Sequence, residues 1–326
     1  MKLHRRGFLH LGAGITALST ASRLARAQTY PTRPITMVVP NSPGTGTDAW
    51  TRIVAERMRG SLKQPIIVEN ILGADGNLGT GRAARAKPDG YTIMMGSYST
   101  HVLNAALYSL PYDVLNDFAP ISPVVMTPYA LFAKKTIQAK DLNELIAWLK
   151  ANPNKASMAF SLGSNHVLSA YFQKETATQF TLVPYRGGGP AVQDLVAGQI
   201  DLYFSNLSYL PLVRAGSIKA YAVTSDRRLA IAPDIPTFAE MGLPTMSSSG
   251  WIGLFAPKGT PNEIIGSLNA AVAVALTDPA VRARIVDLGG EIFPPERWTP
   301  EALRALQKSD AEKWWPIIKA ANIKAE

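Results

Sequence analysis

One stretch of the sequence combines residue types that could hold an anion. The apolar run 35–39 is followed by Asn41-Ser42-Pro43-Gly44-Thr45-Gly46-Thr47-Asp48, and then by a helix-like pattern. A glycine-rich loop between a strand and a helix start offers free backbone N–H groups and the positive end of the helix dipole. The lysine of a Walker loop and the spacing G-x-G-x-x-G are both missing. The loop therefore predicts an anion site and leaves the anion open.

Similar loops, rich in Gly, Ser, Thr and Asn, recur in both halves of the chain. Each follows a strand-like run, and all except the third clearly precede a helix-like run. The loops are 41–48, 73–77, 96–100, 161–165, 185–190 and 204–208. Each alone is weak evidence because many such residues serve only as helix N-caps. In doubly wound α/β lobes, however, these loops gather at one edge of the sheet, so their recurrence predicts a shared cleft lined by neutral donors.

Residues suited to catalysis are few. Beyond the N-terminal segment the only histidines are His101 and His166, and neither has an acidic residue at the spacing of a metal site. The catalytic and metal-binding motifs D-x-D, H-E-x-x-H and G-x-S-x-G are absent. There is no cysteine, hence no thiol nucleophile, disulfide or cysteine metal site. We therefore expect a binding protein without catalytic residues, metal or cofactor. The alternative is an exported hydrolase or lyase with His166 as general base, although a capping or packing role suits His166 equally well.

The elements that position these loops alternate between strands and helices, which is typical of α/β architecture. Strand-like runs occupy 35–39, 66–69, 91–96, 182–184, 200–204 and 221–224; helix-like runs occupy 49–61, 78–86, 142–151, 167–177, 190–197, 207–215, 262–276, 279–288 and 300–321. Roughly 300 residues exceed the usual size of one hydrophobic core, so we expect two lobes.

The N-terminal segment 1–27 has the pattern of an export signal. It combines a basic start, a short apolar run at 11–18 and the end Ala25-Arg26-Ala27. The pair Arg5-Arg6 resembles a twin-arginine signal. Because no cysteine is available for a lipid anchor, we expect a soluble periplasmic protein.

The charge of the chain argues against a nucleic-acid-binding protein. The whole chain carries +9, and five positive residues of segment 1–27 leave the remainder near +4. These charges are spread out, without a basic stripe interleaved with aromatic residues. The mild excess suits a small acidic molecule, although only weakly.

One internal similarity predicts where the chain crosses between lobes. "YALFAKKT" (129–136) resembles "IGLFAPKGT" (252–260), and the two bracket an α/β segment. Chance similarity of two short apolar strands explains this resemblance equally well. We expect lobe 1 to comprise 28–127 and 252–326, lobe 2 to comprise 128–251, and a monomer that closes about 127–133 and 250–256.

Longer segments resemble a known receptor family. "VENILGADGNLGTGRAARAKPDGYTIMMGS", "LPYDVLNDFAPI", "VPYRGGGPAVQDLVAGQIDLYFSN" and "GWIGLFAPKGTP" resemble the Bug family, the periplasmic solute receptors of tripartite tricarboxylate transporters. The resemblance runs from about residue 30 to the C-terminus. It implies a two-lobed type II periplasmic-binding fold, a small carboxylate ligand enclosed between the lobes, and delivery to the membrane components of such a transporter. A receptor that presents its ligand to a membrane histidine kinase would close in the same way and stays open as an alternative.

The resemblance also implies the residues of the site. The first lobe would contribute two loops and a strand end, and the second lobe three loops. In order, these are Asn41, Ser42, Thr45, Gly46 and Thr47; Gly73, Asp75, Gly76 and Asn77; Ser97; Ser161, Gly163, Ser164, Asn165 and His166; Tyr185, Arg186 and Gly187; and Ser205 and Asn206.

Departures from the family pattern bear on the ligand. Asp75 stands where the family usually has glycine, beside the expected anion, so we expect it to point away or to cap the helix. Arg52, one turn into its helix, is expected to face solvent, which leaves backbone N–H groups to hold the carboxylate. Ser205, expected in a loop, stands where amino-acid receptors of the family often carry Asp. This predicts a ligand without an α-ammonium group: a di- or tricarboxylate, or an aromatic carboxylate such as terephthalate.

Overall fold

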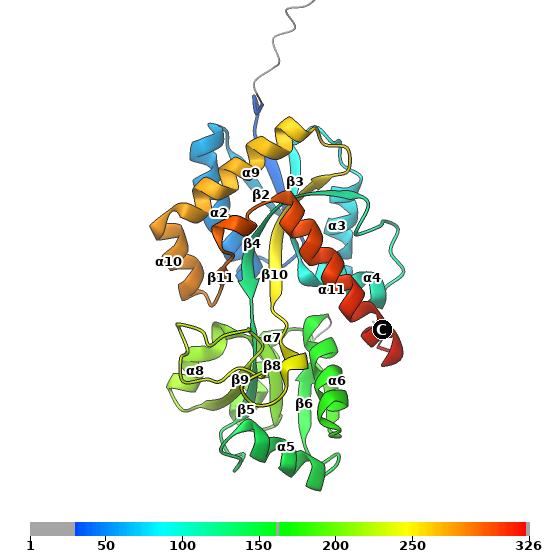
Figure 1. Cartoon of the computed structure of the whole chain (residues 1–326), viewed down its shortest axis with the longest axis vertical. Helices are drawn as coiled ribbons and strands as arrows, with labels where there is room; N and C mark the ends of the chain where they lie inside the picture. Colours follow the sequence, from blue (N-terminus) through cyan, green and yellow to red (C-terminus); the bar gives the residue numbers. More distant parts are fainter. Residues whose placement is uncertain (1–29, 161–162, 324–326) are drawn as a thin grey trace, which may run out of the picture.

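The computed structural model describes residues 30–160 and 163–323, which form two lobes, each built on its own sheet (Figure 1). One sheet has six strands and the other has five. This confirms the expected two-lobed α/β fold. The predicted export signal (1–27) and Ser161 lie outside the described residues.

The first lobe surrounds the six-stranded sheet. Its strand order is β11-β4-β10-β3-β1-β2, with β1 Ile35–Val39, β2 Ile66–Asn70, β3 Thr92–Ser97, β4 Phe118–Thr127, β10 Gly250–Pro257 and β11 Glu291–Ile292. Its helices are α2 Gly46–Leu62, α3 Asn77–Ala84, α4 Asn104–Leu107, α9 Asn262–Thr277, α10 Pro279–Asp287 and α11 Pro300–Ala320, with short turns η2 Ala74–Gly76, η3 Ser99–Leu103 and η6 Pro295–Arg297. Strands β2 and β3 both pair in parallel with the buried strand β1, so the loops that follow all three open at one edge.

The second lobe surrounds the five-stranded sheet. Its order is β7-β6-β8-β5-β9, with β5 Tyr129–Lys134, β6 Ser157–Phe160, β7 Thr181–Pro184, β8 Leu202–Asn206 and β9 Ile218–Val223. The helices and turns are α5 Leu142–Ala151, α6 Ser164–Thr176, α7 Gly188–Ala197, η4 Leu207–Tyr209, α8 Leu210–Arg214 and η5 Pro244–Met246. Strands β6, β7 and β8 run parallel, and they too direct their following loops to one edge.

The two crossings between the lobes are joined to each other. The chain leaves β4 at Thr127 and enters β5 at Tyr129, and Gly250 of the returning strand pairs opposite Thr127. The hydroxyl of Thr224, the residue after β9, accepts a hydrogen bond from the N–H of Tyr129 (2.9 Å), and its carbonyl accepts one from the N–H of Ser248 (2.9 Å). The segments expected to bend, 127–133 and 250–256, are mostly paired within strands β5 and β10, which leaves little free backbone outside the crossings themselves.

The C-terminal helix α11 ties the lobes together from outside. Figure 1 shows it running from the first lobe toward α6 of the second lobe. The ring of Trp314 contacts Tyr98 of the first lobe (6.3 Å between centroids) and Tyr171 of α6 (5.2 Å). Lys313 donates to the carbonyl oxygen of Ser247 (3.1 Å), close to the returning crossing. Relative movement of the lobes must therefore also change the contacts of this helix.

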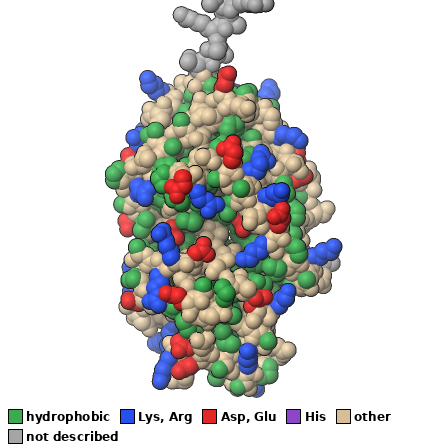
Figure 2. Space-filling view, in the orientation of Figure 1, with side chains coloured by type: hydrophobic (Ala, Val, Ile, Leu, Met, Phe, Trp, Pro, Cys, Tyr) green, Lys and Arg blue, Asp and Glu red, His purple; other side chains and the backbone are tan. Residues whose placement is uncertain are grey.

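The surface and the helices give two further results. On the face shown in Figure 2, positive and negative side chains are interspersed, without a patch of one sign. Among the described helices, no single one is long and apolar enough to cross a bilayer; the pair α9 and α10 meets the criterion together only across a 76° bend.

Candidate functional site

A cavity of about 240 Å³ lies where loops of the two lobes meet. Its walls are mainly hydroxyl, amide and aromatic side chains from the edges of both sheets. The residues that line it are Asn41, Thr45, Gly46, Thr47, Trp50, Asp75, Ser97, Tyr98, Ser99, Thr100, Thr127, Tyr129, Ser164, Asn165, Asn206, Trp251 and Ile252. Five of the six recurring loops identified in the sequence thus contribute to a shared cavity, whereas loop 185–190 does not.

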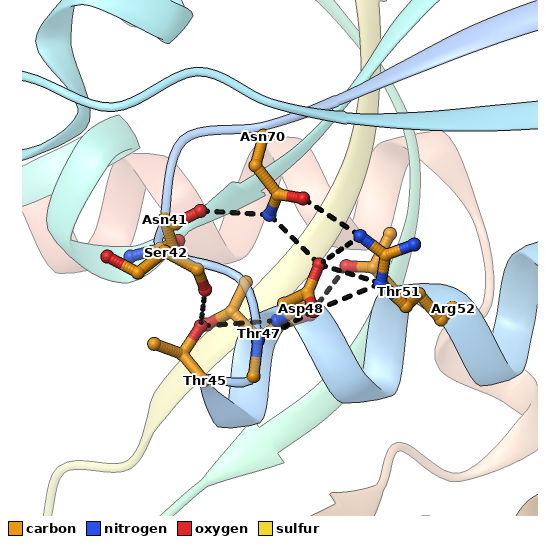
Figure 3. A network of polar contacts seen from close by, with 9 residues as sticks. Asn41, Ser42, Thr45, Thr47, Asp48, Thr51, Arg52 and Asn70 are labelled. Carbon is orange, nitrogen blue, oxygen red and sulfur yellow. Dashed lines mark hydrogen bonds and ion pairs between the residues drawn. The ribbon is translucent and has the colours of Figure 1, made fainter.

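The first loop is shaped around a buried carboxylate, Asp48 (Figure 3). The side chain of Asp48 is only 4% exposed, and it accepts hydrogen bonds from the N–H of Gly44 (2.9 Å), Nε of Arg52 (3.0 Å) and Nδ2 of Asn70 (2.9 Å). Burial alone would raise the pKa of Asp48, but these hydrogen bonds outweigh it and lower the pKa below its usual value. The carboxylate is therefore charged, and its hydrogen bonds fix the shape of the loop.

The same network fixes the loop from the neighbouring strand. Asn70, at the end of β2, donates to the carbonyl oxygen of Asn41 (2.9 Å) and accepts from Nη2 of Arg52 (2.8 Å). Arg52 is exposed, as expected, with half of its side chain accessible to solvent, but its guanidinium group is also held by Asp48 and Asn70. Arg52 is therefore not free to form a clamp on a ligand.

The loop ends at the start of helix α2, beside the cavity. Thr45 is the N-cap: its Oγ1 lies 3.5 Å from the N–H of Asp48, and its carbonyl accepts from the N–H of Ala49 (2.9 Å). The preceding N–H groups, of Gly46 and Thr47, have no acceptor among the described residues, as expected for a first helical turn. Both residues line the cavity, so the helix presents two free donors and its positive dipole end there.

The second loop brings Asp75 to the cavity wall. Asp75 has left-handed backbone angles (φ 53°, ψ 38°) within η2, and the next residue, Gly76, has φ 86°. A Cβ on Gly76 would lie 2.9 Å from Cγ2 of Thr100 and 3.0 Å from the carbonyl oxygen of Pro40, so only glycine fits there. The expectation that Asp75 points away or caps helix α3 is wrong: it lines the cavity, and the N-cap of α3 is Gly76, without a side-chain bond. The tight turn leaves the carboxyl group directed between the lobes.

The third loop and the second lobe meet through a pair of hydroxyl groups. Ser99 Oγ and Ser164 Oγ, from η3 and the first turn of α6, are 2.8 Å apart. Asn165 is held by hydrogen bonds from its Nδ2 to the carbonyl oxygen of Phe204 (2.7 Å) and to the hydroxyl of Tyr203 (3.1 Å). The second-lobe wall is therefore fixed to strand β8 and in contact with the first lobe.

Several predicted residues do not line the cavity. They are Ser42, Gly73, Gly76, Asn77, Gly163, His166, Tyr185, Arg186, Gly187 and Ser205. Ser205 was expected in a loop, which is wrong: it lies inside β8, pairs with Ala130 and is 5% exposed. Arg186 is exposed, and the ring of His166 stacks on Phe160 at 4.2 Å. Ligand contact by the residues of this group stays a prediction.

Others have clear structural roles. Asn77 Oδ1 accepts hydrogen bonds from Asn104 (2.7 Å) and Tyr112 (3.1 Å), which anchors the start of α3. The hydroxyl of Tyr185 donates to Asp194 on α7 (2.6 Å). His101 is completely buried against Phe255, and burial lowers its pKa to about 3, so it is neutral.

The sequence interpretation missed the aromatic part of the wall. Missed lining residues are Trp50, Tyr98, Ser99, Thr100, Thr127, Tyr129, Trp251 and Ile252. Ser99 and Thr100 belong to a loop that the pattern had identified, whereas Trp251 reaches the cavity only through the pairing of β10 with β3 and β4. Nε1 of Trp251 donates to Asp310 of α11 (2.7 Å), which orients the ring.

The chemistry of the wall suits binding. Asp75 is the only acidic side chain, and there is no basic one, among the described residues that line the cavity. No group of three or more His, Asp or Glu suited to a metal ion occurs in residues 30–160 and 163–323. Neutral hydrogen-bond donors around a polar cavity can hold a small anion by replacing its water shell.

Comparison with known proteins identifies relatives along most of the chain. Residues 50–323 match the family described as tripartite tricarboxylate transporter family receptor. Protein BugT of Bordetella pertussis is 36% identical over 303 residues, which cover 91% of this chain and 92% of BugT.

Solved structures agree in fold. MatC of Rhodopseudomonas palustris with bound malate is 36% identical, with a TM-score of 0.79 over 89% of this chain and all of the MatC chain. An R. palustris protein solved with adipate is 31% identical, with a TM-score of 0.81 over 90% of this chain and 99% of its own. The periplasmic binding protein BugD is 34% identical, with a TM-score of 0.79 over 91% of this chain and all of BugD. Together, the family match over most of the chain and these solute-binding relatives show that the chain belongs to the tripartite tricarboxylate transporter receptor family and is a solute-binding protein, not an enzyme.

Proposed function

We propose that this protein is a periplasmic receptor that captures a small carboxylate and delivers it to the membrane components of a tripartite tricarboxylate transporter. The observation that carries the proposal is the cavity between the lobes, where the free N–H groups of Gly46 and Thr47 meet neutral donors of the second lobe. Two relatives of similar fold were solved with malate and with adipate, which are carboxylates.

We infer that one carboxylate group of the ligand lies on the start of α2. The N–H groups of Gly46 and Thr47 would bind its oxygens, and the hydroxyl group of Ser97 would complete the shell. The far end of the ligand would meet the second-lobe wall, which includes Asn206. Because Arg52 is occupied by Asp48 and Asn70, the carboxylate would be held by neutral donors rather than by an arginine.

The ligand class that we propose is a di- or tricarboxylate, or an aromatic carboxylate such as terephthalate. Ser205 gives no reason for this choice, since it is buried in β8. The support comes from the polar walls, from the size of the cavity and from the carboxylates seen in relatives.

The organisation that we propose follows from the function. Residues 1–27 would direct export and be removed, 28–127 with 252–326 would form the first lobe, and 128–251 the second. The protein would act as a monomer that closes about its two crossings on binding. The joined crossings at Thr127 and Gly250 support this arrangement.

A thermal-shift screen of carboxylates tests the proposal. Malate, succinate, adipate, citrate and terephthalate would each be added to the purified protein. A ligand at a hundredfold excess over its Kd stabilises the folded state by about 2.7 kcal/mol, which gives a clear rise in Tm. Thr47→Pro, which removes one free N–H group at a position where proline is tolerated in a helix, should abolish the shift.

The matched control is Glu263→Pro, at the second position of helix α9 and outside the cavity, which should leave the ligand shift intact. If none of the five acids raises Tm, the proposed ligand class is wrong. Uptake of a bound acid by cells that contain the transporter components, and its loss without this receptor, would test delivery.

A further inference from the structure

Asp75 occupies an unusual position for an acidic residue in an anion-binding cavity. It lies in the second loop of the first lobe, and its carboxyl group faces the second lobe across the cavity wall. A Cβ built on Gly163, the N-cap of α6, would lie 3.2 Å from Oδ2 of Asp75 and 3.4 Å from Oγ of Ser99. In the described arrangement, the start of α6 in the second lobe therefore covers this carboxyl group.

Oδ2 of Asp75 is buried and has no hydrogen-bond partner among the described residues. Its backbone carbonyl accepts from Asn104 Nδ2 (3.0 Å), so the turn itself is held in place. A buried carboxylate without donors or a cation is strongly unfavourable, whereas the protonated acid is far less so. Burial accordingly raises the pKa of Asp75 to about 6.

The hydroxyl groups around Asp75 bring no positive charge, and the start of α6 brings only the partial charge of a helix end. Beyond α4, the phenol of Tyr108 lies near it, and from β5 the phenol of Tyr129; burial, and to a lesser degree Asp75, raises the pKa of both. The loop after β3 contributes the neutral Ser99. On α6, the titratable side chain nearest in sequence to the wall is His166, whose ring stacks on Phe160.

We propose that a carboxylate ligand enters this cavity together with one proton, which Asp75 holds and donates as a hydrogen bond to the ligand. The inference rests on the proposed function, because it assumes an anionic ligand. The proton comes from a hydronium ion or a buffer acid when the ligand binds: the O–H or N–H bond of that donor breaks, and the O–H bond of the Asp75 carboxyl group forms. A neighbouring anion must raise the pKa of Asp75 further, since like charges disfavour ionisation. Asp75 would then select anions over zwitterions with an ammonium group.

The proposal has a defined pH dependence. Below a pH of about 6, Asp75 is already protonated in the described arrangement, and the affinity should not change through this group. Above it, protonation must accompany binding, so Kd should rise by about tenfold for each pH unit. Between pH 6.5 and 8.5, Kd should therefore rise by up to about a hundredfold, a range in which aliphatic carboxylic acids stay ionised.

Isothermal titration calorimetry with malate, adipate and succinate as probes tests this. Titrations at pH 7.5 in two buffers of different ionisation enthalpy count the protons taken up, and we expect about one per ligand. The variant Asp75→Asn should take up none and should lose the pH dependence of Kd. Asparagine keeps the shape of the side chain and tolerates the left-handed backbone.

The matched control is Asp287→Asn, which removes the same charge from an exposed position on α10 and should keep the wild-type uptake. Binding of a probe without proton uptake would overturn the inference and leave the receptor proposal standing. Binding of an amino acid that Asp75→Asn abolishes would also overturn it, because Asp75 would then act as a carboxylate. If no probe binds, both proposals fail.

Discussion

Asp48→Asn should loosen the loop that lies behind the cavity. The carboxylate accepts from Gly44, Arg52 and Asn70 at 2.9–3.0 Å, and its side chain is 4% exposed. Asparagine fits the space but loses the charge and turns an N–H group toward donors. A hydrogen bond to a charged group contributes about 1.5–3 kcal/mol, and the three bonds are not additive because they share one acceptor. Arg52 regains part of its hydration, so we expect a loss of about 2–3 kcal/mol.

Thermal unfolding followed by circular dichroism measures this loss. For a chain of this size, about 2–3 kcal/mol corresponds to a fall in Tm of about 3–5 °C. The pKa of Asp48 is lowered in the folded state, so its contribution is complete above the usual value of 3.8 and is lost as the pH falls through the folded value. The difference between the wild type and Asp48→Asn should therefore be full at pH 7 and shrink below about pH 4.

The control is Glu69→Gln on the neighbouring strand β2. Glu69 forms a two-pronged ion pair with Arg82 (2.7 and 3.0 Å), but the two side chains are 39% and 54% exposed. An exposed pair of this kind contributes about 0–1 kcal/mol. If Asp48→Asn lowered Tm no more than Glu69→Gln at pH 7, Asp48 would not hold the loop, and the reasoning would be refuted.

Three further changes test other parts of the structure. Ser164→Ala removes the 2.8 Å hydrogen bond to Ser99 between the lobes, and small-angle scattering should show a larger radius of gyration without ligand; an unchanged radius would contradict this. Asp310 accepts a hydrogen bond from Trp251, and burial raises its pKa to about 6. The unfolding free energy of the wild type, measured by urea titration, should therefore fall as the pH rises from 4 to 6. Asp310→Asn should remove the part of this fall that Asp310 causes. Gly250→Ala places a Cβ 2.6 Å from the facing hydroxyl on β4 and should cost about 1–3 kcal/mol of unfolding free energy; an unchanged Tm would show that the crossing adapts.

Local patterns were enough to predict most of the elements. The strand at 35–39 and the helix at 142–151 have the predicted bounds. Helix α2 begins at Gly46, three residues before the predicted start, because Thr45 serves as the N-cap. The long strand β4 was not predicted, since Pro120 and Pro123 interrupt its pattern; its register shifts beside both prolines accommodate them.

Sequence by itself determined the two-lobed α/β fold, the family and the first loop of the site. These follow from local chemistry: strand and helix periodicity, glycine-rich turns and helix caps act over a few residues, and the resemblance covers nearly the whole chain.

Only the tertiary structure decided which side chains reach the cavity. Ser205 does not line the cavity, because β8 extends past the predicted strand end and pairs Ser205 with Ala130 of β5. Trp251 does line it, because β10 pairs with β4 in the first sheet. Asp75 reaches the wall because it lies in a run of residues with positive φ, from Gly73 to Gly76, that turns its side chain inward, and it is covered by Gly163 from the other lobe. Burial, and with it the protonation state of Asp75, arises from the contact of segments far apart in the sequence, so no local pattern could have predicted it.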